Sequence, residues 1–377
     1  MAEGYVFTSA TDVNDLLNQI ISQAAVHGWT QNELSTFSSA GRRGHISKDG
    51  VTLNFCSMPG PNAETGGTNT ILNTIIPPAD QFQSSGSYRW CYLLGTIPTY
   101  TFYCPDVICI NAGTGYSGGS PWYRQPGADV MAAANNQGRF SVLRAKGAIG
   151  KVHMFFFDNP SAIFVFAEVR AGEWYWLAGG NLQKDYEYAG GQFYGASMRD
   201  DDIVDAYPFS FSAMEHRVAD AGVSITRGNG WGSAYQSAPD AKVFGTRYQL
   251  PQGRWLPGYY MAHYNGYAPN EDDTSQVQLR GYDGATGRLW IHPPYAYAAR
   301  TGGGSSYLGV LPHVHYSTTE AFIGGDVVSI GGVEYMVLPF NWRASPWDKD
   351  AYNTQAASLC WTRNNHNGAG AAIRKPA

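Results

Sequence analysis

Alternation of apolar and polar positions is clearest in the middle of the chain, between residues 151 and 184. Three runs of β-branched and aromatic residues lie there, at His153–Phe157, Ala162–Arg170 and Glu173–Ala178. Asp-Asn-Pro separates the first two runs and Ala-Gly separates the last two, and both are turn-forming sequences. The pattern predicts a central antiparallel meander of three strands over residues 151–179.

Both faces of the middle predicted strand are apolar over most of its length. Because successive side chains point to opposite faces, one face carries Ile163, Val165 and Ala167. The opposite face carries Phe164 and Phe166. A sheet with one solvated face would show polar side chains along that face. Each face therefore needs a cover, which is either a second sheet of the same chain or a neighbouring subunit.

One amphipathic helix is predicted near the N-terminus, over residues 11–27. Thr11 or Asp12 can cap its start, and Gly28 is placed to end it in the left-handed conformation. Trp29 is expected to pack back on the apolar stripe; a helix that binds a partner is the alternative. The apolar positions that recur with the helical period are Val13, Leu16, Leu17, Ile20, Ile21 and Ala24.

The rest of the chain alternates short strand patterns with long loops rich in glycine and proline. Two hairpins are predicted, at residues 44–56 around Asp49-Gly50 and at residues 326–338 around Gly331-Gly332. Residues 364–377 are rich in Asn, Gly and Ala and have little to bury. We expect a tail there that is flexible, or ordered only against a neighbour.

Together these patterns predict a mainly β fold, with β-sandwich-like antiparallel sheets, an N-terminal amphipathic helix and long loops, and thus α+β overall. We expect two lobes: an N-terminal lobe of residues 1–140 and a β-rich body of residues 141–363. The flexible tail of residues 364–377 follows them.

The composition favours a protein that buries surface against other subunits. Charged residues make up only 15% of the 377 residues, while 45 Gly, 25 Tyr and 11 Trp are present. The net charge is −5, and acidic residues equal or outnumber basic ones in each part of the chain. A nucleic-acid groove needs a concentrated positive field, so none is expected.

The cysteines indicate a reducing compartment. Their number, five, is odd, and the N-terminus lacks the basic and apolar regions of a signal peptide. We expect free, mostly buried thiols, since Cys104 and Cys109 have the wrong spacing for a redox motif. No apolar run approaches the ~20 residues that span a bilayer, so we expect a soluble protein without a membrane segment. The cysteines are Cys56, Cys91, Cys104, Cys109 and Cys360.

The glycine-rich stretch at residues 112–127 does not match a phosphate-binding loop, because no Gly-Lys-Ser/Thr follows its glycines. It is instead predicted to be a long exposed loop that carries Tyr116, Trp122 and Tyr123. Aromatic side chains exposed on a loop favour contact with another molecule. A host-surface glycan is one such molecule.

Metal ligands are not expected. His313 and His315 would share one face of a strand, but no third ligand lies nearby in the sequence, which favours a hydrogen-bonded pair. The acidic cluster at residues 199–205 lacks the EF-hand order of ligands and is predicted to be a solvated loop.

Catalytic residues and cofactors are not expected either. No nucleophile elbow is expected: Gly115-Tyr116-Ser117-Gly118-Gly119 matches the Gly-x-Ser-x-Gly spacing, but the sequence around it predicts a loop and not a strand that leads into a helix. Glu168 and Glu173 lie among aromatic residues that could stack sugars, as in a glycoside hydrolase. However, Glu168 shares a face with Arg170, and a structural ion pair is the preferred interpretation. We therefore predict a protein that is not an enzyme.

Four stretches resemble virion structural proteins of tailed bacteriophages. They are SATDVNDLLNQIISQAAVHGWT at residues 9–30, GYSGGSPWYRQPG at residues 115–127, the meander at residues 153–184 running on to GGQFYG, and residues 308–343. The resemblance implies a β-rich subunit that forms a symmetric ring or sleeve around the tail, at the neck or tail-completion end rather than the baseplate. Its partners would be copies of itself and other virion proteins, after synthesis in the host cytoplasm.

Three functions follow as hypotheses: a structural subunit of the virion, a glycan- or receptor-binding tail module, and a glycan-cleaving enzyme. The first is preferred. The candidate interaction residues are Tyr116, Trp122, Tyr123, Phe164, Phe166, Trp174 and Trp176.

Overall fold

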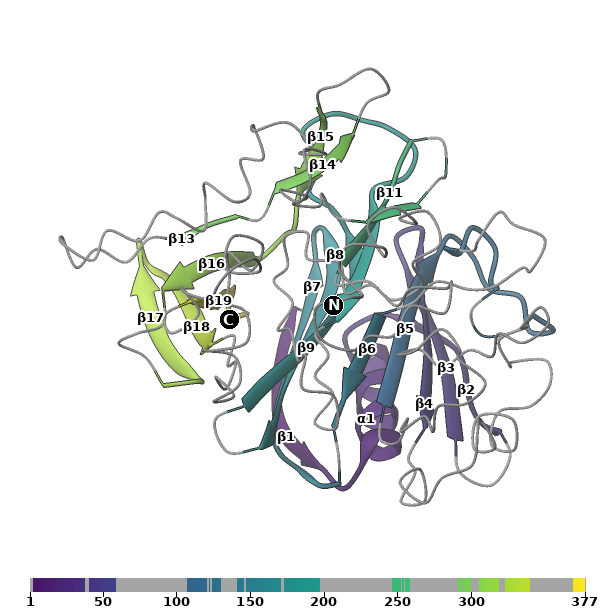
Figure 1. Cartoon of the computed structure of the whole chain (residues 1–377), viewed down its shortest axis with the longest axis horizontal. Coiled ribbons are helices and arrows are strands. Elements are labelled where there is room, and N and C mark those ends of the chain that lie inside the picture. Colours follow the sequence, from purple (N-terminus) through teal and green to yellow (C-terminus); the bar gives the residue numbers. More distant parts are fainter. Residues whose placement is uncertain are drawn as a thin grey trace, which may run out of the picture.

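The structure is a computed structural model that gives a mainly β protein, as predicted (Figure 1). It describes residues 3–37, 41–58, 107–120, 122, 124–129, 141–145, 147–170, 173–196, 246–251, 253, 255–257, 291–293, 295–299, 305–318, 323–339 and 369–376.

The largest sheet has seven antiparallel strands in the order β1-β7-β8-β9-β10-β11-β12. Its centre is the predicted meander, since β7, β8 and β9 pair in succession. The strands are β1 (Gly4–Ala10), β7 (Ile149–Asp158), β8 (Ser161–Arg170), β9 (Glu173–Asn181), β10 (Gln192–Ala196), β11 (Thr246–Gln249) and β12 (Trp255–Pro257).

A second sheet has five antiparallel strands in the order β2-β3-β4-β5-β6. The predicted hairpin joins β3 to β4, and Asp49 and Gly50 both have positive φ, 46° and 79°, as its two-residue turn requires. The strands are β2 (Thr30–Phe37), β3 (Gly41–Lys48), β4 (Val51–Met58), β5 (Val107–Gly113) and β6 (Ser141–Arg144).

These two sheets and helix α1 (Val13–Val26) enclose one apolar core. The helix packs against β1 on one side and β2–β4 on the other. The sheets approach each other closely at Gly179 of β9, where a Cβ atom would lie 2.6 Å from Leu53 of β4. Because β1 pairs with β7 and β5 pairs with β6, both sheets combine strands from either side of residue 140.

The helix ends follow the sequence signals. Asp12 is the N-cap, and its Oδ1 accepts a hydrogen bond from the backbone N of Asp15 at 2.8 Å. Gly28 has φ 84°, and the backbone N of Trp29 donates to Ala24 O at 2.9 Å, which satisfies a terminal carbonyl. Trp29 is buried against the core, as predicted.

A third sheet lies near the C-terminus, with the order β13-β16-β19-β18-β17. Its strands are β13 (Ile291–His292), β16 (Val314–Thr318), β17 (Asp326–Ile330), β18 (Val333–Pro339) and β19 (Ala369–Arg374), and a separate pair is formed by β14 (Tyr295–Ala299) and β15 (Ser305–Val310). The predicted hairpin at Gly331-Gly332 joins β17 to β18.

The expectation of a flexible tail at residues 364–377 is wrong for residues 369–376. Strand β19 is the middle strand of the third sheet and pairs with β16 and β18 of its own chain. Ala371, Ala372 and Ile373 are fully buried. Small side chains have little surface to bury, but here they let a strand fit between two neighbours.

Candidate functional site

The sheet of strands β2–β6 carries a row of buried polar side chains, here called the polar ladder, on the face that points away from the core. His45 on β3, Asn54 on β4 and Asn111 on β5 lie directly opposite one another and are fully buried. Side chains alternate along each strand, so neighbours such as Ile46 point to the core instead. Glu33 on the edge strand β2 pairs with His45 and extends the ladder.

Hydrogen bonds along the ladder assign the tautomer of His45. Asn54 Nδ2 donates to Asn111 Oδ1 at 2.8 Å, so Asn54 Oδ1 faces His45 Nδ1, 2.7 Å away. A carbonyl oxygen only accepts, and His45 Nδ1 therefore carries the proton. The other ring nitrogen, Nε2, is an acceptor without a hydrogen-bond partner, and it lies 3.8 Å from Glu33 Oε2.

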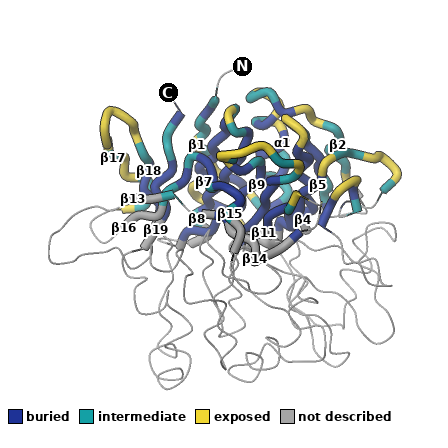
Figure 2. Tube along the Cα trace, turned by 90° about the horizontal axis from the view of Figure 1, so that it is seen from above, coloured by how far each residue is buried: buried dark blue, intermediate teal, exposed yellow. Residues whose placement is uncertain are grey.

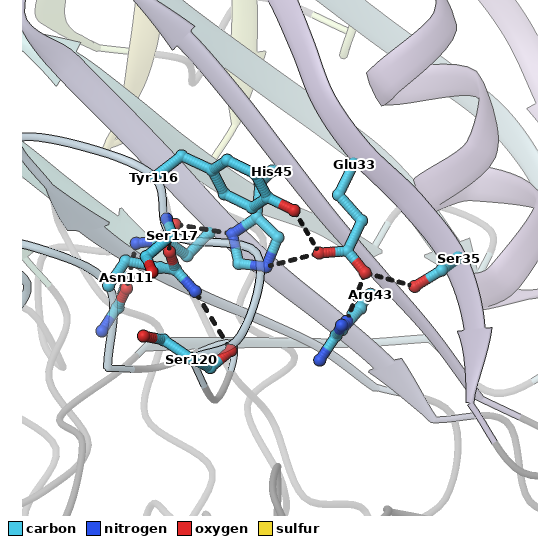
Figure 3. A network of polar contacts seen from close by, with 10 residues as sticks. Glu33, Ser35, Arg43, His45, Asn111, Tyr116, Ser117 and Ser120 are labelled. Carbon is cyan, nitrogen blue, oxygen red and sulfur yellow. Dashed lines mark hydrogen bonds and ion pairs between the residues drawn. The ribbon is translucent and has the colours of Figure 1, made fainter.

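Glu33 is the hub of this network (Figure 3). Its carboxylate accepts hydrogen bonds from Arg43 Nε at 2.6 Å, Ser35 Oγ at 2.7 Å and Tyr116 Oη at 2.9 Å. Burial raises the pKa of Glu33, but these three hydrogen bonds and the charge of Arg43 outweigh it and lower that pKa below its ordinary value. Glu33 is therefore ionised near neutral pH.

Burial acts in the opposite sense on the neighbouring imidazole. It lowers the pKa of His45 to about 4, against the hydrogen bond that His45 donates to Asn54 and the charge of Glu33, which raise it. Tyr116 has a raised pKa because of burial and its hydrogen bond to the Glu33 carboxylate. At neutral pH the cluster thus holds one carboxylate, one guanidinium, a neutral imidazole and a phenol.

The cluster fastens the segment of residues 114–129 to the sheet. Tyr116 comes from this segment, and the Gln125 side chain closes it internally by accepting from Ser117 N at 2.7 Å and donating to Ser120 O at 3.3 Å. In the next row of the ladder Cys56 faces Cys109, and both are buried cysteines outside any disulfide bond, as expected of these two thiols. Burial raises the pKa of the Cys109 thiol well above its ordinary value, which opposes a nucleophilic role.

The predicted exposed aromatic loop is only partly as expected. Trp122 is fully buried, so the expectation that its ring is exposed is wrong. The segment folds back on β5, because Thr114 N donates to Pro126 O and Asp129 N donates to Ala112 O. Tyr116 is half-buried on Glu33, and Tyr123 lies outside the described residues.

The four aromatic candidates of the meander are also buried: Phe164, Phe166, Trp174 and Trp176. On this outer face of the seven-stranded sheet, Phe164 contacts Phe193, and the His313 ring stacks on Phe157. The apolar sheet face that needed a cover is thus covered by the chain itself at these positions.

His313 and His315 are arranged differently from the prediction. His313 lies in the turn before β16 with φ 63°, so only His315 is on a strand, and the shared strand face predicted for them is wrong. In the described part of the chain, no group of three His, Cys, Asp or Glu side chains is placed to hold a metal ion.

The remaining predicted sites receive little support. Glu168 forms an ion pair with Lys151 directly across the β7–β8 ladder, at 2.9 Å. The side chains of Arg170 and Glu173 and the acidic cluster at residues 199–205 lie outside the described residues. Among the helices that the structure describes, none is long and apolar enough to cross a membrane.

The exposure of apolar side chains on and beside the predicted β17–β18 hairpin is the feature that sequence reasoning missed. Strand β17 is an edge of the third sheet, and residues 323–333 around it hold four of the seven exposed large hydrophobic side chains among the described residues (Figure 2). The signal was the run Asp-Val-Val-Ser-Ile, which places valine or isoleucine on both faces of the strand. These exposed side chains are Ile323 (79% exposed), Val327 (44%), Ile330 (36%) and Val333 (38%).

The fold and these sites define a mainly β protein with two packed sheets, a third sheet in which β17 is the last of the described strands, and a buried polar ladder. No protein-family model matches the chain, and no curated protein is significantly similar to it.

Proposed function

We propose that this chain is a structural subunit that assembles with copies of itself, as a symmetric ring or sleeve at the neck or tail-completion end of a tailed-phage particle. The place in the particle rests on the resemblance of the four sequence stretches. The assembly rests on the open edge of β17 and the exposed apolar side chains beside it.

The edge of β17 has the properties of an interface. An edge strand presents unpaired backbone N–H and C=O groups, and soluble proteins usually protect such edges with lysine, proline or a bulge. Strand β17 has none of these and carries a single charge, Asp326. Val327 and Ile330 are exposed on it, so a partner strand would bury apolar surface as well as gain hydrogen bonds.

Copies of the same chain are the partner of choice. A homo-oligomer places the same edge on every subunit and closes by symmetry, which removes the exposed edges from solvent. The buried meander aromatics such as Phe164 do not contribute, because the chain covers them itself. The proposed role requires no catalysis, cofactor or metal.

The glycan- or receptor-binding function stays a prediction, and the two candidate loop residues that the structure describes do not favour it. Trp122 is buried and Tyr116 is engaged with Glu33.

Substituting the edge tests the proposal. In the double variant Val327→Lys, Ile330→Lys, two charges on β17 should block strand pairing. We expect the wild-type chain to form one defined oligomer in native mass spectrometry, with closed rings or sleeves in electron micrographs. The double variant should be monomeric at the same concentration, with an unchanged circular dichroism spectrum.

The matched control is Val26→Lys, because Val26 is 66% exposed but lies at the end of α1. This variant should assemble like wild type. A wild-type chain that stays monomeric at high concentration, or a double variant that assembles normally, would contradict the proposal.

A further inference from the structure

The third sheet is joined to the outer face of the seven-stranded sheet through His313. The His313 ring stacks on Phe157 with centroids 4.0 Å apart and an interplanar angle of 16°. Its Nε2 lies 3.2 Å from the Pro160 carbonyl oxygen, in the turn between β7 and β8. On the other side, Arg374 of β19 places Nε 3.3 Å and Nη2 3.2 Å from His313 Nδ1.

Only a neutral imidazole satisfies both neighbours. The Pro160 carbonyl accepts, so His313 Nε2 carries a proton and donates it. The guanidinium of Arg374 only donates, so His313 Nδ1 must be the lone pair. A second proton at Nδ1 would remove this acceptor and place an imidazolium about 3 Å from a guanidinium, at a site largely shielded from water.

The charged groups around His313 do not compensate such a proton. Arg374 faces it from β19 and His315 from β16, and both disfavour a positive charge. Glu3, which precedes β1, is the facing carboxylate, but it already binds Arg374 Nη2 at 2.6 Å. Burial and Arg374 lower the pKa of His313 to about 4, against the Pro160 hydrogen bond and Glu3, which raise it.

His45 provides the contrast within the same chain. Its pKa is also lowered to about 4 by burial, but its Nε2 faces the ionised Glu33 carboxylate at 3.8 Å. Protonation of His45 would create an ion pair, whereas protonation of His313 would create a repulsion. Protonation would therefore break the contacts that His313 makes across the joint, whereas the contacts of His45 within the ladder can remain.

The two parts of the molecule are also separate in their packing. The apolar core around α1 contains no residue of β13–β19. Other contacts across the joint are a cation–π contact of Arg374 with Phe157 at 5.0 Å, and backbone hydrogen bonds between Gln183 and Val310. The backbone hydrogen bonds between Gln183 and Val310 do not depend on pH. They can therefore keep the third sheet attached after His313 has lost its contacts.

We propose that His313 is a pH-operated catch, whose protonation releases β16, β18 and β19 from the outer face of the seven-stranded sheet while the core around α1 stays folded. His153 lies on the same outer face, where its Nδ1 and Tyr5 Oη are hydrogen-bonded at 2.8 Å, and Lys151 and Glu168 are the charged groups facing it. This device is independent of the assembly function.

Amide hydrogen exchange read by mass spectrometry between pH 7 and pH 4.5, corrected for intrinsic rates, tests the catch. If opening of the third sheet takes up one proton at His313, its equilibrium constant should rise about tenfold for each unit by which the pH falls. This holds between the pKa of His313 in the open state, near 6.5, and its pKa in the closed state, about 4. Peptides of β16, β18 and β19 should show this slope, while those of α1, β3 and β4 stay protected.

The variant His313→Asn removes the titrating group, and asparagine tolerates the φ of 63° at this position. It should abolish most of the pH slope in β16, β18 and β19. In Arg374→Gln, the amide can still donate to His313 Nδ1 but carries no charge, so the slope should be shallower even if His313→Asn does not fold. The matched control His315→Asn removes a neighbouring imidazole and should keep the slope.

Three results would each overturn the catch. They are exchange in β16, β18 and β19 that does not depend on pH beyond the intrinsic rate, a full slope retained in both His313→Asn and Arg374→Gln, and core peptides that lose protection at the same rate as the third sheet.

Discussion

At the scale of single residues, the aromatic face of the meander contributes strongly to stability. Phe164 is fully buried, with its ring 6.1 Å from those of Phe157 and Phe193. We expect Phe164→Ala to lower the free energy of unfolding by about 3–5 kcal/mol, because it loses apolar burial and leaves a cavity. Urea denaturation followed by fluorescence would measure the change.

Phe7→Ala is the matched control, since Phe7 is 57% exposed on the edge strand β1 of the same sheet. Its cost should stay below about 1 kcal/mol, as for most surface substitutions. Equal costs for the two variants would show that the covering of Phe164 contributes little.

At the scale of elements, strand β19 holds the third sheet together. Deleting residues 369–377 leaves β16 and β18 without their common partner and removes Arg374 from His313. We expect the third sheet to lose its protection against hydrogen exchange, and the chain to become prone to aggregation through the freed strand edges.

The control deletion, of residues 375–377, keeps β19 and loses the bond from Lys375 N to Glu334 O. It should leave β16 and β18 protected. If β16 and β18 also stay protected after the longer deletion, β19 does not contribute to the stability of the third sheet, which would contradict this prediction.

Elements with strong local signals could be predicted, and elements held by distant contacts could not. The helix has Asp12 and Gly28 at its ends, and the β3–β4 hairpin has Asp49-Gly50, so short-range chemistry decides both. Strand β19 reads Ala-Gly-Ala-Ala-Ile-Arg, which has little strand propensity, and its neighbours in the sheet override that preference.

The candidate site shows the same division. The burial of Phe164 followed from its alternation, but the identity of the cover did not, because His313 lies far along the chain. Trp122 stands in a loop sequence, and only the fold of that loop onto β5 buries it. The hydrogen bond from Tyr116 to Glu33 joins residues that are 83 positions apart, and no local sequence pattern could indicate it.

At the scale of the whole molecule, the buried His45 and His153 and the half-buried His313 tie stability to pH. Burial lowers the pKa values of His45, His153 and His313 to about 4 each, from an ordinary value of 6.5. The unfolded chain therefore binds more protons than the folded one within this window. The stabilisation is complete above pH 6.5 and is lost as the pH falls toward 4, with an upper bound of about 3 kcal/mol for each histidine.

The free energy of unfolding should thus fall steeply between pH 6.5 and pH 5, where carboxylates with ordinary pKa values are still ionised. Each histidine contributes a slope of about 1.4 kcal/mol per pH unit. His45→Gln keeps a donor for Asn54 but cannot titrate, so it should reduce the slope measured by urea denaturation by about that amount. Because a structural role alone would shift the curve without changing its slope, an unchanged slope in this variant would mean that His45 is already protonated in the folded chain.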